Sequence, residues 1–149
     1  MTMAETLGSL CDKLTIVKLK QWHTDDDQRQ NSLAQQEQLL LREINEFVHK
    51  ATSGEILEER LTFASNKVYT LEGNSVPDVR GTIGEVFSRL AYVNCKLWHE
   101  QERVYSFEEV PAEEKNVVVK QLAILNLERN RCIDEIDRLF HEAVLSTPR

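Results

Sequence analysis

The sequence lacks the features that mark several classes of protein. Its 149 residues include only 5 glycines and 3 prolines, and no stretch alternates apolar and polar residues as a half-buried strand does. No apolar run is long enough to span a bilayer, and the N-terminal residues have no basic segment followed by an apolar core. We therefore expect an all-α protein of the cytoplasm, without membrane insertion.

Motifs for catalysis are missing as well. The chain contains no GxSxG elbow, no P-loop and no Cys–His nucleophile signature. Its three cysteines, Cys11, Cys95 and Cys132, form no CxxC pair, so we interpret them as small hydrophobic residues in a reducing compartment. The net charge of −7 argues against a nucleic-acid partner. The sequence leaves open whether the protein is an enzyme.

Two parts of the chain resemble each other. Residues 6–23, TLGSLCDKLTIVKLKQWH, return at 82–99 as TIGEVFSRLAYVNCKLWH. A second match pairs residues 43–51, EINEFVHKA, with residues 135–143, EIDRLFHEA. Two copies at so long a period do not predict a solenoid. They predict a duplicated helical hairpin whose two copies pack face to face.

Apolar residues at three- and four-residue spacing place the helices. The predicted helices cover residues 4–23, 29–52, 82–104 and 111–144, with a less regular helix at 55–71. Capping-box spacing marks two of the starts, at Thr2 with Glu5 and at Thr82 with Glu85. We predict one domain, an antiparallel four-helix bundle with repeat 1 at 4–52, a helical crossover at 53–80 and repeat 2 at 81–145.

Polar residues interrupt the apolar seams of the second and fourth helices. Glu37 and Arg129 occupy matching repeat positions, which favours a buried ion pair or an arginine whose stem alone is buried. Alternatively, Asn126, Arg129 and Asn130 lie on one helix face and offer donors for an anionic or sugar-like ligand. The residues that we predict around such a pocket are Arg129, Asn126, Asn130, His99, Glu102 and Trp98.

The four histidines raise the question of a metal site. Glu46 and His49 have the Glu-x-x-His form of di-iron bundles, but the second copy has Arg138 in place of the glutamate. His23 and His99 also end helices at the opposite pole of the bundle from His49. We therefore predict no metal site and no cofactor.

The first and third helices are apolar on a second side. Ile16, Leu19 and His23 lie away from the main seam of the first helix, and Tyr92, Cys95 and His99 do so on the third. Either the crossover segment or a second subunit covers these faces, so a homodimer is one of two hypotheses. The tryptophans, Trp22 and Trp98, flank the main seam and are predicted to be packing anchors.

The second repeat resembles a known bacterial family. GTI at 81–83, KLWHEQ at 96–101 and LNLERNRCIDEIDRLF at 125–140 are similar to the family catalogued as domain of unknown function 4254. The resemblance implies an all-helical fold and an association with cell-surface polysaccharide gene clusters, and it implies no activity. The leading hypothesis is a binding or scaffold protein that serves surface-polysaccharide biosynthesis. The alternative is a small enzyme or ligand receptor with its pocket around Arg129.

Overall fold

The computed structural model describes residues 5–62 and 78–146, and these residues contain four α-helices and no strand. The elements are α1 (Leu7–His23), α2 (Asp27–Ser53), η1 (Glu58–Arg60), α3 (Ile83–Tyr105), η2 (Phe107–Glu109) and α4 (Ala112–Leu145). Their arrangement as a four-helix bundle confirms the predicted fold class. None of the described helices combines the length and the apolarity needed to cross a bilayer.

Local capping sets where the helices begin and end. Thr82 and Glu85 exchange side-chain and backbone hydrogen bonds, which confirms the capping box predicted for α3. The first helix begins later than predicted, because Thr6 is its N-cap. The Thr6 hydroxyl accepts a hydrogen bond from the backbone N–H of Ser9, and the Ser9 hydroxyl accepts one from the backbone N–H of Thr6. α2 ends before Gly54, whose φ of 84° is a left-handed conformation that glycine adopts without strain.

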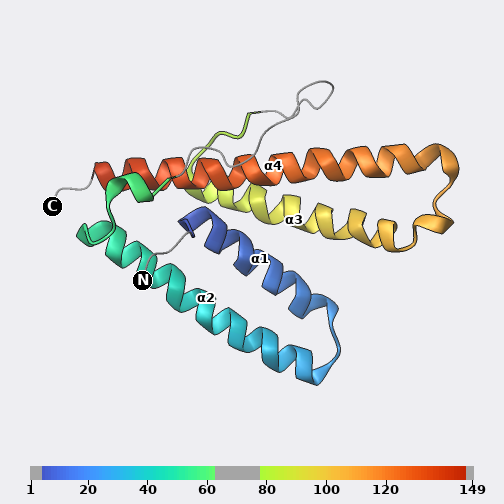
Figure 1. Cartoon of the computed structure of the whole chain (residues 1–149), viewed down its shortest axis with the longest axis horizontal. Coiled ribbons are helices and arrows are strands. Elements are labelled where there is room, and N and C mark those ends of the chain that lie inside the picture. Colours follow the sequence, from blue (N-terminus) through green and yellow to red (C-terminus); the bar gives the residue numbers. More distant parts are fainter. Residues whose placement is uncertain (1–4, 63–77, 147–149) are drawn as a thin grey trace.

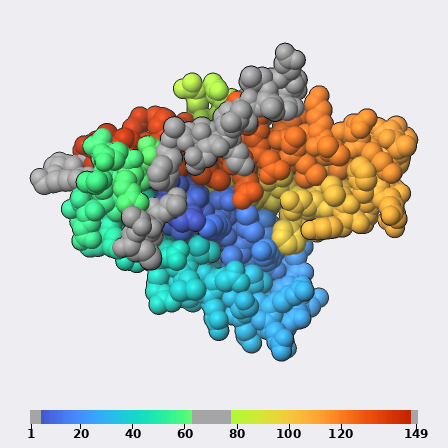
Figure 2. All heavy atoms as spheres, viewed as in Figure 1, coloured from blue at the N-terminus to red at the C-terminus, as the bar shows by residue number. Residues whose placement is uncertain are grey.

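The helices form two antiparallel hairpins that diverge from a shared end (Figure 1). α1 contacts the other three helices, whereas α2 packs chiefly on α1. At the shared end, the ring centroids of Phe47 in α2 and Phe140 in α4 lie 6.0 Å apart. Beyond it, the α1/α2 hairpin and the far halves of α3 and α4 project as two arms of the surface (Figure 2).

The hydrophobic core is concentrated at the shared end. Its fully buried side chains include Leu10, Phe47, Leu61, Leu90 and Ile136. A smaller cluster of Val93, Leu97 and Leu125 lies within the α3/α4 hairpin. The main core therefore joins all four helices, while the second stabilises only one hairpin.

The crossover differs from the prediction. Residues 55–62 contain the short 3₁₀ turn η1 instead of an α-helix, and the buried Leu61 anchors this segment to the core. The rest of the predicted 55–71 helix lies outside the described residues, as does much of the linker at 72–81. The four elements are compatible with a duplicated hairpin, but the duplication itself stays a prediction.

α1 and α4 approach each other closely at Gly8. A Cβ atom on Gly8 would lie 2.5 Å from the backbone oxygen of Ile133 and 2.9 Å from Oδ1 of Asp137. Gly84 occupies the same position in the first turn of α3, and a Cβ atom there would meet nothing within 4 Å. Of these two equivalent glycines, only Gly8 is required by packing.

We predict opposite effects for the two matched substitutions. Gly8→Ala should lower the free energy of unfolding by about 2 kcal/mol, because the added methyl group meets a helix backbone that has to move. Gly84→Ala should be neutral or stabilise by up to about 1 kcal/mol, because alanine favours a helix and has free space. Urea unfolding of both variants measures this. Equal effects would show that the α1–α4 approach is looser than described.

Candidate functional site

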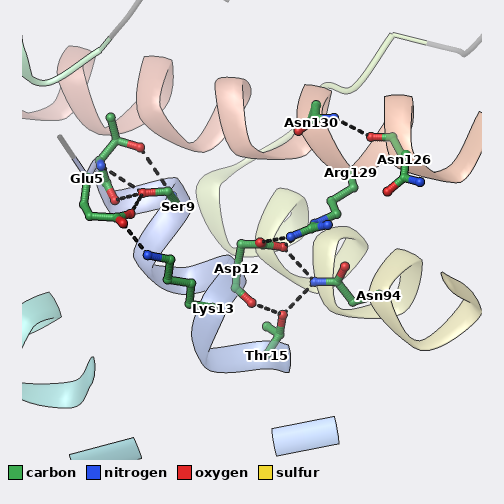
Figure 3. A network of polar contacts seen from close by, with 10 residues as sticks. Glu5, Ser9, Asp12, Lys13, Thr15, Asn94, Asn126, Arg129 and Asn130 are labelled. Atoms are coloured by element: carbon green, nitrogen blue, oxygen red, sulfur yellow. Dashed lines mark hydrogen bonds and ion pairs between the residues drawn. The ribbon is translucent and has the colours of Figure 1, made fainter. Parts of the chain in front are cut away.

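Arg129 lies in a polar network that joins three helices (Figure 3). Its Nε atom donates to Oδ1 of Asp12 at 2.9 Å, and its Nη2 atom donates to Oδ2 at 2.5 Å. Nδ2 of Asn94 donates to the same Oδ1 at 2.9 Å and to the Thr15 hydroxyl at 2.7 Å. The buried carboxylate of Asp12 on α1 is thus paired from both α4 and α3.

This pairing fixes the Arg129 guanidinium. The bidentate hydrogen bond to Asp12 raises the pKa of Arg129 above its usual value, although burial acts in the opposite direction. A carboxylate as buried as Asp12 requires such a partner, because an uncompensated charge in a helix interface is costly. Arg129 therefore has a structural role, whatever else it binds.

The predicted pair of Glu37 with Arg129 is wrong. Glu37 forms its ion pair with Lys18 of α1 and accepts a hydrogen bond from Gln21 at 3.4 Å. The reason is the divergence of the hairpins, since α2 packs chiefly on α1 and does not face α4 at this level. Matching repeat positions do not face each other there.

The two asparagines contact each other along α4. Nδ2 of Asn130 donates to the backbone oxygen of Asn126 at 2.7 Å, and the Asn126 side chain is exposed beside Arg129. Both belong to the helix face predicted from the sequence. Their hydrogen bond is local to α4, so it does not itself create a site between helices.

The other predicted site residues lie on the last turns of α3. Nε1 of Trp98 donates to Oε1 of Glu102 at 2.7 Å, and the Trp98 ring stacks on His23 of α1 with centroids 4.6 Å apart. His99 is exposed. Within the described residues, no hydrogen bond, ion pair or ring contact joins this group to Arg129, and no cluster of three His, Cys, Asp or Glu residues is suited to a metal ion.

An apolar groove between α1 and α3 was only partly foreseen. Its volume is about 340 Å³, and it is lined by Leu14, Thr15, Lys18, Leu19, Trp22, Phe87, Ala91 and Cys95. Leu19 and Cys95 belong to the predicted second faces. Trp22 was predicted to be a packing anchor, but it is 85% exposed. Cys95, which we interpreted from the sequence as a small hydrophobic residue, is exposed.

Asp137 is a buried titratable residue that the sequence pattern did not reveal. It is 5% exposed, and its Oδ1 atom accepts a hydrogen bond from the backbone N–H of Gly8 at 2.7 Å. Burial raises the pKa of Asp137 to about 6, although hydrogen bonds from Thr6 and Gly8 act against the shift. Gly8 was the sequence feature that could have indicated this contact, because a residue without a side chain permits the close approach of α1 and α4.

The chain matches no family model, no curated protein sequence and no solved structure. The likeness of residues 81–140 to the family of domain of unknown function 4254 therefore stays a prediction. The assignment of a function has to come from the geometry of this chain.

We predict that Arg129 contributes to stability. Arg129→Leu should lower the free energy of unfolding by about 2 kcal/mol, because it leaves the buried Asp12 carboxylate without its charged partner and the site is partly solvated. Arg138→Leu is the matched control and should change the stability much less, since the ion pairs of Arg138 within the described residues are with its neighbours Glu135 and Glu142 on α4. Chemical denaturation distinguishes them. An unchanged stability in Arg129→Leu would favour a ligand-binding role.

We also predict a pH-dependent contribution from Asp137. Its pKa is raised from 3.8 to about 6 in the folded chain, so folding is favoured at low pH and loses stability as the pH rises through this range. Relative to Asp137→Asn, the wild type should lose about 2 kcal/mol between pH 4 and pH 7. Unfolding of both proteins across that range tests this. A constant difference would contradict the raised pKa.

Proposed function

We propose that this protein is a non-catalytic binding module that forms a homodimer through the groove between α1 and α3. The observation that carries the proposal is Trp22, a large aromatic side chain that is 85% exposed at the edge of an apolar groove. Exposed tryptophans beside apolar pockets are typical of interface hot spots. Such a residue gains free energy when a partner covers it.

A second copy of the chain is the occupant that we propose for the groove. A two-fold interface brings the same patch of both subunits together, so Trp22 of one copy can lie in the groove of the other. The patch also fits a subunit interface in its charge. Among the described residues that line it, Lys18 alone is charged, and it is already paired with Glu37, so association would bury no unpaired charge from these residues.

The arrangement of titratable groups supports binding over catalysis. Asp12 and Arg129 neutralise each other between helices, and Asp137 is buried against Gly8. None of these three lines the apolar groove. An enzyme would place groups with shifted pKa values around its cavity. The cytoplasmic setting and a role in surface-polysaccharide biosynthesis remain parts of the proposal, and the latter depends on the resemblance of residues 81–140.

We predict that the wild type is a dimer. Trp22→Lys should raise the dissociation constant of this dimer at least about tenfold, because a lysine there would be buried without a partner. Tyr105→Lys is the matched control, since Tyr105 is 87% exposed and does not line the groove. Sedimentation equilibrium of the three proteins measures the dissociation constants. A wild type that stays monomeric at high concentration contradicts the proposal, as does equal weakening by both substitutions.

A further inference from the structure

A second, basic pocket lies at the turn between α1 and α2. Its volume is about 420 Å³, and it is lined by Lys20, His23, Thr24, Arg29, Ser32, Leu33, Gln36 and Trp98. The lining contains two permanent cations, hydroxyl groups and an aromatic pair, and it includes no carboxylate. The lining is therefore positively charged, although the adjoining turn carries the exposed carboxylates of Asp25, Asp26 and Asp27.

The two cations of this pocket form no ion pair within the described residues. Lys18, two residues before Lys20 on α1, pairs with Glu37. In the part of the chain that the structure describes, neither Lys20 nor Arg29 forms an ion pair. Asp26 of the adjoining turn is engaged in capping α2, where its carboxylate accepts the backbone N–H of Arg29. Lys20 and Arg29 are therefore available to pair with an external anion.

One wall of the pocket is an ordered aromatic surface. The rings of His23 and Trp98 are stacked at 4.6 Å with an interplanar angle of 21°. Trp98 is held by its hydrogen bond to Glu102, and His23 by a 2.7 Å contact between Nδ1 and the Leu19 carbonyl oxygen. Since a carbonyl oxygen only accepts, Nδ1 carries the proton. Both rings are thus fixed before a ligand arrives, which lowers the entropic cost of binding.

We propose that this pocket binds a phosphate monoester that carries a ring. Lys20 and Arg29 pair with the phosphate group, whose charge of about −1.5 to −2 near neutral pH matches two cations. The hydroxyl groups of Thr24 and Ser32 supply neutral donors. The ring of the ligand lies against the wall of His23 and Trp98. The site is separate from the groove between α1 and α3, because no residue lines both.

Isothermal titration calorimetry of the full chain tests the site with three probes: glucose 1-phosphate, AMP and inorganic phosphate. Lys20→Gln and Arg29→Gln should each weaken the binding of a ring-bearing probe by about tenfold, because each removes one charged hydrogen-bond donor. Lys120→Gln is the matched control, because it removes the same charge from α4 outside the pocket. It should leave the affinity unchanged. The stronger of the two ring-bearing probes identifies the source as a sugar phosphate or a nucleotide.

Trp98→Ala separates the two parts of the proposal. It should lower the affinity for glucose 1-phosphate or AMP several-fold and leave the affinity for inorganic phosphate unchanged, because only the aromatic wall is lost. No binding of any probe at millimolar concentration would overturn the proposal, as would equal losses in Lys20→Gln and Lys120→Gln. Inorganic phosphate that binds as tightly as both ring-bearing probes would overturn the assignment of the ring.

Discussion

The carboxylate of Asp12 is the group on which the arrangement of the helices depends. It is buried on α1, and it is tolerated there because Arg129 of α4 and Asn94 of α3 both donate to it. These directional bonds fix the rotation of α1 against the α3/α4 hairpin. The contact of Gly8 with α4 fixes the same helix one turn earlier. α1 is therefore held to the second hairpin through its N-terminal half.

Among the described residues, the C-terminal half of α1 forms no buried charged pair with the second hairpin; it contacts α3 through the stacking of His23 on Trp98, and the two hairpins separate there (Figure 1). The consequence is a helix whose sides are available to other molecules. One side, with Leu19 and Trp22, borders the apolar groove towards α3. Another, with Lys20 and His23, borders the basic pocket towards α2. Two surfaces of opposite chemical character thus have a common structural origin.

The sequence predicted the features that depend on residues close together in the chain, namely the helices and their caps. Helical periodicity located all four helices, and the spacing of Thr82 and Glu85 located the start of α3. The sequence did not reveal the partner of Arg129, because Asp12 has no charged counterpart in the second repeat, where the matching residue is Ser88. The rotation of α1 that buries Asp12 is a tertiary effect. Of the predicted site residues, Trp98 and Glu102 contact each other, whereas Arg129 belongs to a different network.

The position of the main core at one end of the molecule also determines how stability is distributed along α1. Leu10 and Cys11 pack into the cluster shared by all four helices, whereas Trp22 and His23 at the other end are exposed. Local opening of a helix needs less free energy where few apolar contacts are broken. The backbone amides around Leu10 therefore exchange hydrogen with solvent later than those of the last turn of α1, which is held by the stacking of His23 on Trp98 and by hydrogen bonds from Gln30 rather than by a buried core.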